Sequence, residues 1–268
     1  MGKTLTLTAF AVALGFSALT AAHADAVSDI QARGTLVVGV KADYRPFGYL
    51  DASGKIVGFG PDLAADVAKQ LGVKLQMVPV VASNRVQYLQ QGKIDIILAT
   101  LTDTPQRDKL MDMVDPHYYG AGVNILAPKS ADFKSWDQLR GKKVCLIQGT
   151  FTNKDLQTQY GVQGLAFPGT AEAYSALRNG SCAAFAYDDT AIQGELLKPQ
   201  WKDYDMPLTS IFFTPWSIGA KKGENHFASV LSKMVVGWHK SGKILDLEKK
   251  WGIKPIAFAQ QEHEKYSK

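Results

Sequence analysis

Residues 94–107 read IDIILATLTDTPQR, which is an apolar run followed by a polar turn and the start of a helix. The run at residues 94–98 predicts a buried strand. Either Asp103 or Thr104 can cap the helix that follows, and Pro105 is tolerated in its first turn because the missing N–H would have no partner there. A strand that leads into a helix is the repeating unit of an α/β fold.

Arg107 lies in the first turn of this expected helix. A cation near a helix N-terminus is unfavourable in the field of the peptide dipoles, so we expect Arg107 to have a binding partner. A free carboxylate would suit the position, because the guanidinium fork, a threonine hydroxyl and backbone N–H groups would meet it together. The alternative is an ordinary capped surface helix with a solvated arginine, and this stretch alone leaves both open.

On both sides of this stretch, predicted strands alternate with predicted helices, which favours an α/β sheet that is mostly parallel. Strands are expected at residues 35–40, 56–59, 74–78, 94–98, 123–126, 144–148, 165–167 and 182–187. Helices are expected at residues 29–33, 61–71, 84–91, 153–160, 171–179, 189–197, 226–240 and 244–251, and the last two finish the predicted fold.

The α/β pattern starts again near residues 118–122, and a further extended stretch follows at 212–220. Neither half contains a Gly/Ser-rich linker. We therefore predict two α/β lobes that share two extended crossovers, with the ligand cleft between them. Lobe 1 then comprises residues 25–117 and 213–268, and lobe 2 comprises residues 118–212.

The first 24 residues have the pattern of a signal peptide. A short basic start and an apolar run over residues 5–22 precede the A-x-A sequence at residues 22–24, which predicts cleavage before Asp25. A membrane anchor is the alternative, but threonine and glycine interrupt the run. No later segment has enough uninterrupted apolar residues to span a bilayer, so we expect a soluble protein exported to the periplasm.

Composition and motifs argue against several classes of function. The chain has 46% hydrophobic and 21% charged residues and a formal net charge of +5, but its basic residues are scattered, so nucleic-acid binding is not expected. It has no phosphate-binding loop and no G-x-S-x-G motif. We expect no metal and no cofactor, because the histidines are dispersed, at His23, His117, His226, His239 and His263.

The two cysteines, Cys145 and Cys182, each lie in a segment with strand character. An oxidising compartment favours a disulfide between them over two buried free thiols. Closing that loop would stabilise the fold by roughly 4 kcal/mol in the chain-entropy description.

Six short motifs follow one another between residues 35 and 251: LVVGV at 36–40, VGF at 57–59 with DL at 62–63, GKID at 92–95, TDTPQR at 102–107, GKKV at 141–144 and YD at 187–188. Their order and spacing resemble the type II periplasmic substrate-binding proteins of polar amino-acid ABC transporters. The resemblance implies a two-lobed periplasmic-binding-protein fold of type II that closes on an amino acid by a hinge motion. It also implies delivery of the ligand to membrane permease subunits, by a protein that we expect to be a monomer.

A free amino acid carries a carboxylate and an ammonium on one carbon, so a selective cleft needs a cation and an anion. Arg107 and Thr102 are predicted to bind the carboxylate. By the resemblance, Thr100 and Phe151 contribute backbone groups, and Asp188 binds the ammonium. Asp188 could instead cap the helix that follows it. We assign the ligand to Asp188 and the cap to Asp189.

Four residues are candidates for contact with the ligand's side chain. Lys41 and Arg85 resemble, in position, cations of family members that bind aspartate or glutamate; the alternative is that they pair with local carboxylates such as Asp43, in weak surface ion pairs. Tyr44 can cover the ligand or pack under its loop, and packing is preferred for Phe47. Thr170 is placed to reach the ligand's side chain.

Three candidate cations against one ligand-facing anion predict an acidic ligand, L-aspartate or L-glutamate, because leaving a buried charge unpaired is costly. Glutamine, histidine and arginine are the alternatives, and the aromatic Tyr44 is also compatible with glutamine, histidine or aromatic ligands. The rival class is an enzyme on the same fold, such as a cyclohexadienyl dehydratase, which would need a carboxylic acid free to transfer protons. We expect binding and not catalysis.

Overall fold

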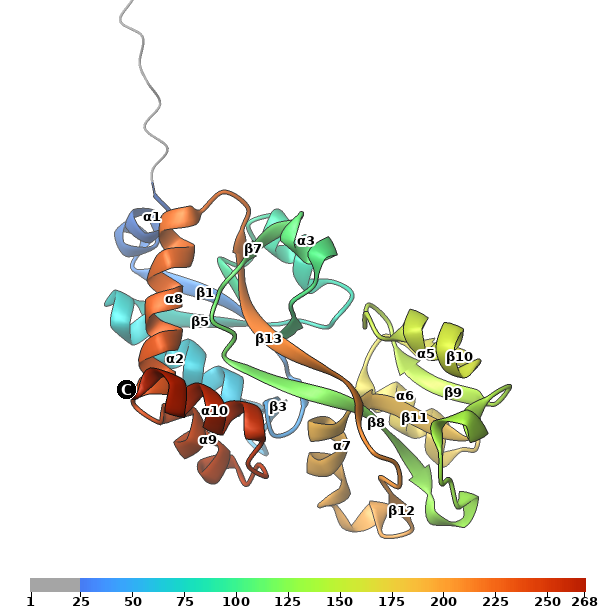
Figure 1. The fold of residues 1–268 in the computed structure, drawn as a ribbon. Helices are drawn as coiled ribbons and strands as arrows, with labels where there is room; N and C mark the ends of the chain where they lie inside the picture. Colours follow the sequence, from blue (N-terminus) through green and yellow to red (C-terminus); the bar gives the residue numbers. More distant parts are fainter. Residues whose placement is uncertain (1–24) are drawn as a thin grey trace, which may run out of the picture.

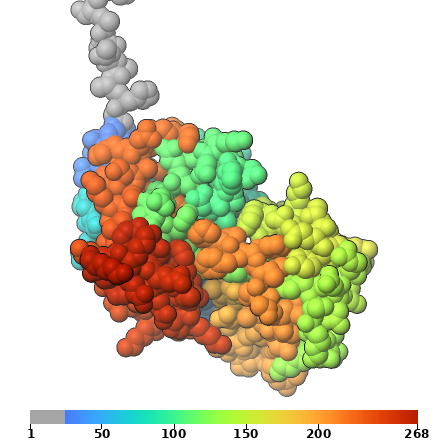
Figure 2. Space-filling model, in the orientation of Figure 1, coloured from blue at the N-terminus to red at the C-terminus, as the bar shows by residue number. Residues whose placement is uncertain are grey.

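The computed structural model describes residues 25–268, so the predicted signal peptide at residues 1–24 lies outside the described residues. Two α/β bodies lie side by side and are joined by two long strands that run between them (Figure 1). Figure 2 shows the surfaces of the two bodies in contact on this face, with residues of the returning strand between them. No helix of residues 25–268 has the length and apolar character needed to cross a membrane.

The first part of the chain builds lobe 1 up to the first crossover. Its helices are α1 (Ala26–Arg33), α2 (Phe59–Leu71), α3 (Arg85–Gln90) and α4 (Pro105–Asp108). Its strands are β1 (Thr35–Val40), β2 (Asp43–Tyr44), β3 (Gly48–Leu50), β4 (Ile56–Val57), β5 (Lys74–Pro79), β6 (Ile96–Thr102) and β7 (Met111–Met113).

The chain then crosses to lobe 2 along β8 (Tyr119–Pro128) and returns along β13 (Ile211–Lys221). Between them lie β9 (Lys143–Ile147), α5 (Asn153–Tyr160), β10 (Gln163–Phe167), α6 (Thr170–Arg178), β11 (Ala184–Asp188), α7 (Asp189–Leu196) and β12 (Tyr204–Asp205). Single turns of 3-10 helix occur at Lys129–Ala131, Trp136–Leu139 and Pro199–Trp201. The chain ends with α8 (Asn225–Lys240), α9 (Lys243–Trp251) and α10 (Ala257–Tyr266).

One sheet runs through both lobes in the strand order β10-β9-β11-β8-β13-β6-β1-β5. The pairs within each lobe, β5-β1-β6 and β10-β9-β11, are parallel, whereas β8 and β13 pair antiparallel to their neighbours. β13 pairs with β8 through its first half and with β6 through its second half. The predicted two-lobed α/β fold with two crossovers is therefore confirmed. We propose lobe boundaries at residues 118 and 213, at the start of β8 and within β13.

Alternate residues of the buried strands face different helices, as the two-residue period of a strand requires. In β6, Ile96 and Leu98 belong to the same core cluster as the α2 residue Leu63. Ile97 and Ala99 instead belong to the cluster that contains Leu89 of α3. Helices therefore cover both faces of the sheet, which explains why these strands are apolar without interruption.

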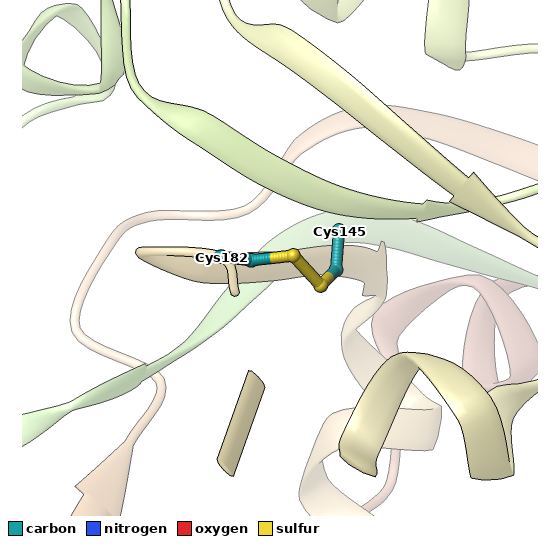
Figure 3. The surroundings of a disulfide bond; sticks show 2 residues. All are labelled: Cys145 and Cys182. Carbon is teal, nitrogen blue, oxygen red and sulfur yellow. A yellow bond between two sulfur atoms is a disulfide. The ribbon is translucent and has the colours of Figure 1, made fainter. Parts of the chain in front are cut away.

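The predicted disulfide between Cys145 and Cys182 is confirmed, with the two Cα atoms 5.5 Å apart (Figure 3). Cys145 lies within β9, but Cys182 lies before β11 begins at Ala184, so its assignment to a strand was wrong. The bond ties the turn after α6 to the neighbouring strand of the lobe 2 sheet.

The predicted elements match the observed ones apart from several shifts. Phe59 begins α2 and does not extend a strand, and β6 continues to Thr102 instead of ending at residue 98. The short strands β2, β3, β7 and β12 were not predicted, since two or three residues carry no periodicity. The helix α10 was also missed, because only Ala259 of its residues is fully buried and its apolar pattern is weak.

Candidate functional site

The strand β6 is irregular near its end, at Thr100. Thr100 has a φ of 51°, which is unusual for a β-branched residue, and the pairing of β6 with β13 shifts register in this region. The carbonyl oxygens of Ala99 and Thr100 both accept hydrogen bonds from Nη1 of Arg85, the second at 3.1 Å. The Thr100 N–H donates to the Tyr118 hydroxyl at 3.1 Å. Both backbone groups of Thr100 therefore have partners within the protein, and the predicted contact of its backbone with a ligand stays a prediction.

Arg107 lies in α4, and its side chain is held against the end of β6. The hydroxyl of Thr104 accepts the Arg107 N–H at 3.3 Å, so Thr104 is the cap of α4. The Arg107 guanidinium folds back and donates to the Thr102 carbonyl at 2.6 Å. Burial, together with the nearby charge of Arg85, lowers the pKa of Arg107 to about 9, so the group remains a cation at neutral pH. An anion placed beside Arg107 would relieve both effects.

The other candidate cap, Asp103, has a different partner. Its carboxylate lies 2.8 Å from Nε2 of His117, at the start of the crossover. The side chain of Asp103 therefore points to the residues just before β8 and not to the N–H groups of α4.

Asp188 lies at the end of β11, where α7 begins. It holds the N-cap position of α7, but its side chain makes no capping hydrogen bond. Its carboxylate accepts a hydrogen bond from the Tyr44 hydroxyl at 3.0 Å. Burial raises the pKa of Asp188 to about 7, and the nearby Asp189 adds to this, while Tyr44, Arg85 and Lys41 oppose it.

The assignment of the α7 cap to Asp189 was wrong, because Asp189 is already the first residue of the helix. Its carboxylate bonds to the Ser210 side chain and to the backbone of Thr190 and Gly122, so it ties α7 to the crossover. The carboxylate of Asp188 makes no capping bond to α7 and accepts its hydrogen bond from Tyr44.

Lys41 is buried and has a carboxylate partner of its own, since its Nζ lies 2.7 Å from Oδ1 of Asp43. This is the local ion pair that the alternative interpretation named. Burial lowers the pKa of Lys41, and the charge of Asp43 partly offsets this. Thr170 is also buried, and its hydroxyl donates to the carbonyl oxygen of Asp43 at 2.7 Å. Lys41 and Thr170 were two of the four residues predicted to contact the ligand's side chain. Both instead contact Asp43 of lobe 1.

Tyr44 and Phe47 both pack into an aromatic cluster at the base of the crossovers. The ring of Tyr44 lies 5.5 Å from those of Phe47 and Tyr187, measured between centroids. Phe47 also packs edge-on against Trp216 of β13, as its predicted packing role requires. The hydroxyl of Tyr44, however, donates a hydrogen bond to Asp188 and also forms a hydrogen bond of 2.8 Å with the Thr190 hydroxyl.

Arg85 is the first residue of α3 and is 4% exposed. Its Nε is buried without a hydrogen-bond partner among residues 25–268. Phe151 lies in the turn before α5 and is half-buried.

The candidate site residues do not balance in charge. Lys41 and Asp43 neutralise each other as an ion pair. The cations of Arg85 and Arg107 then face the single carboxylate of Asp188, which leaves one positive charge in excess.

Sequence reasoning missed two tyrosines of this group. Tyr118 orders the irregular end of β6, and Tyr187 is buried between Tyr44 and Phe185. Tyr187 belongs to the YD motif at 187–188 and Tyr118 begins the stretch at 118–122, but an aromatic residue at a strand position is typical of a core. Among residues 25–268 no group of His, Cys, Asp or Glu side chains could hold a metal ion. The arrangement suits a small zwitterion with a carboxylate near Arg107 and a cation near Asp188.

Comparison with known proteins places this site in a family context. The sequence pattern of the bacterial extracellular solute-binding proteins, family 3, matches residues 36–254. The ABC transporter glutamine-binding protein GlnH of Bacillus subtilis is 31% identical over 85% of this chain and 84% of its own length. The L-glutamate/L-aspartate-binding protein of Pseudomonas aeruginosa is 26% identical over 85% of this chain and 80% of its own.

Solved structures share the fold as well. A mutant of ArgBP from T. maritima superimposes with a TM-score of 0.79 at 29% identity, covering 85% of this chain and all of that one (100%). ArgBP has also been solved with arginine bound. These relatives agree on the fold and differ in the amino acid that their names give.

Proposed function

The chain belongs to family 3 of the bacterial extracellular solute-binding proteins, and on this premise we propose that it captures a free L-amino acid between its two lobes. The protein then acts as the periplasmic component of an ABC importer and passes the amino acid to the membrane permease subunits. Its working form is a monomer. The names of its relatives, which include binding proteins for glutamine and for glutamate and aspartate, support this class of ligand.

The observation that carries the proposal is a pair of opposite charges on different lobes. Arg107 comes from lobe 1 and Asp188 from lobe 2, and neither forms an ion pair with the other's element or with another described side chain. The α-carboxylate of the ligand binds Arg107 and the Thr102 hydroxyl, with the backbone N–H of Phe151 completing its shell. The α-ammonium binds Asp188. Since the two halves of the ligand bind different lobes, binding favours the closed form.

The excess positive charge at Arg85 extends the proposal to the ligand's side chain. An aspartate or glutamate would supply the missing anion, because a buried unpaired cation is costly. Glutamine, as in the relative from Bacillus subtilis, would leave Arg85 with a neutral partner. Arginine or lysine would add a third cation, which the same charges oppose.

Catalysis is the second candidate, and one feature favours it. A carboxylic acid with a pKa of about 7 is also suited to donate a proton at neutral pH. We infer binding instead, because the α-ammonium of an amino acid gives Asp188 a partner. Incubation with prephenate or arogenate, followed by detection of an aromatic product, tests the enzyme directly: turnover would contradict binding as the sole function.

Calorimetric titration of ligand-stripped protein with aspartate, glutamate, glutamine, histidine, arginine and cystine tests the ligand. We expect an acidic amino acid to bind most tightly, with a Kd near 1 μM, which is about −8 kcal/mol. Tight binding of arginine without binding of aspartate or glutamate would overturn the acidic preference but keep the amino-acid class. Binding of none of the six would overturn both.

Arg107→Met tests the position of the site. We expect it to raise the Kd for every ligand by at least about 100-fold, because the α-carboxylate would lose its charged hydrogen-bond donors. Arg140→Met, on the exposed surface of lobe 2, is the matched control and should bind as the wild type. Normal binding by Arg107→Met would mean that the site is misplaced.

A further inference from the structure

The two-residue strand β2 of lobe 1 contacts the beginnings of two lobe 2 helices. Asp43 meets Thr170, the first residue of α6, while Tyr44 meets Asp188 and Thr190 at the start of α7. The Tyr44 contact involves a proposed ligand residue. The Asp43 contact involves none of the groups that are proposed to bind the amino-acid backbone, so it can affect closure without touching the ligand.

Asp43 adds a carboxylate from lobe 1 to the N-terminus of α6, whose own first turn carries Glu172. The N-cap of α6 is Gly169, which has no side chain to accept a hydrogen bond. The Thr170 N–H faces Oδ2 of Asp43 at 3.4 Å, and the Thr170 hydroxyl donates to the Asp43 carbonyl at 2.7 Å. A carboxylate at a helix N-terminus is favourable for the peptide dipoles. Here the carboxylate belongs to one lobe and the helix to the other.

Lys41 holds that carboxylate in place. Its ammonium lies 2.7 Å from Oδ1 of Asp43, opposite the oxygen that faces Thr170. The loop around Lys41 is tight, since a side chain on Gly48 would lie 2.3 Å from the Lys41 carbonyl oxygen. β2 is also paired with β3, so Asp43 projects from a braced hairpin. The lysine ammonium is therefore occupied on the lobe 1 side of the contact.

The contact opens onto a crevice of about 610 Å³ between the lobes, which Ala42, Asp43 and Thr170 help to line. The side chain of Asp43 is 25% exposed, whereas that of Lys41 is 2% exposed. When the lobes separate, water can replace Thr170 as the partner of Asp43. The contact is then made only in the closed form and can contribute to closure.

We propose that Lys41, Asp43 and Thr170 form a latch that stabilises the closed form, and that Lys41 and Thr170 act on lobe closure and not on the ligand's side chain. The proposal rests on the proposed function, because it assumes that closure accompanies amino-acid binding. A latch that never touches the ligand must change the affinity for every ligand by the same factor. A residue that reads the side chain must change the ratio between ligands.

Thr170→Val tests the latch from the lobe 2 side with little change of shape. We expect the Kd values for glutamate, aspartate and glutamine to rise by a common factor of about five, the value of one ordinary hydrogen bond. The rise should appear in the dissociation rate, with the association rate nearly unchanged. Thr158→Val is the matched control, because the Thr158 hydroxyl bonds only within α5.

The double variant Lys41→Met with Asp43→Asn removes the ion pair from lobe 1 as a unit and leaves no lone buried charge. It too should weaken all three ligands equally, with at least the effect of Thr170→Val. Loss of glutamate and aspartate affinity while glutamine affinity is retained would overturn the latch and make Lys41 a reader of the side chain. Unchanged Kd values in both variants would overturn it as well.

A failure of the proposed function would look different, since the wild type itself would bind none of the amino acids. Small-angle X-ray scattering of the ligand-free proteins then decides the latch alone. A more open average conformation of Thr170→Val than of Thr158→Val supports the latch, and identical scattering curves of the two variants overturn it.

Discussion

The carboxyl group of Asp188 is surrounded by groups that pull its pKa in opposite directions. Burial and the adjacent Asp189 favour the neutral acid, whereas the Tyr44 hydroxyl and the cations of Arg85 and Lys41 favour the carboxylate. Burial has the largest effect, and the pKa is raised to about 7 from an ordinary value of 3.8. A bound ammonium would shift this balance toward the carboxylate.

This pKa predicts how ligand-free stability depends on pH. Between about pH 4 and pH 7 the folded protein keeps a proton on Asp188 that the unfolded chain has lost, so stability falls as the pH rises through this window. Asp188→Asn keeps an acceptor for Tyr44 but cannot ionise. We expect the free energy of unfolding of the variant minus that of the wild type to increase by on the order of 2 kcal/mol between pH 4 and pH 8.

Chemical denaturation of both ligand-free proteins across this pH range measures the difference. A difference that stays flat, or that decreases with pH, would contradict the buried and unpaired state of Asp188. The variant should also bind no amino acid at any pH, and wild-type binding should weaken as the pH falls below about 7, because the ammonium then meets a neutral acid.

At the scale of elements, the lobe 2 sheet depends on a covalent link as well as on strand pairing. Cys145 of β9 pairs with Phe185 of β11, and the disulfide joins the same strand to the turn before β11. The bond closes a loop with a sequence separation of 37 residues, which contains α5, β10 and α6. This is the loop that presents Thr170 and the turn around Phe151 to lobe 1.

We expect the double variant Cys145→Ala with Cys182→Ala to lose roughly 4 kcal/mol of unfolding free energy, because the unfolded chain gains the freedom of the opened loop. Urea denaturation at neutral pH measures the loss. Ligand affinity should fall far less than stability, because the lobe 1 half of the site is outside the loop. Unchanged stability would show that the bond does not form in the protein.

Local sequence patterns were sufficient for the long elements and insufficient for the short ones. The strand predicted at residues 35–40 and the helix predicted at residues 153–160 have the same ends as the observed β1 and α5. The helix α10 carries little apolar pattern, and it is a helix because it packs on α8 and α9. Tertiary contacts decide such elements, since propensity alone is a weak preference.

At the scale of the whole molecule, glycines allow the two lobes to approach. Gly194 of α7 lies so close to lobe 1 that a Cβ atom would be 2.6 Å from the Arg45 carbonyl oxygen. Gly149 of lobe 2 similarly lies against the backbone of Ala82 and Ser83. Both contacts are between lobes and both involve backbone atoms, which cannot move aside cheaply.

Gly194→Ala should therefore separate closure from folding. Alanine favours the helix by about 1 kcal/mol, so ligand-free stability should be equal or higher, whereas the added methyl obstructs the closed form and should raise every Kd by at least about tenfold. Calorimetric titration and thermal unfolding measure the two effects. Gly237→Ala is the control, since a Cβ there meets no atom within 4 Å; equal affinities of the two variants would mean that the lobes do not close as described.

The sequence by itself determined the two-lobed α/β fold, the disulfide and the strand-to-helix turn that carries Arg107, because each follows from local patterns or from the chemistry of one compartment. Only the tertiary structure brings Lys41, Asp43 and Thr170 together, because Asp43 and Thr170 are 127 residues apart in the sequence and meet where the two lobes touch. The same holds for the raised pKa of Asp188, which depends on burial that no neighbouring residue in the chain reveals.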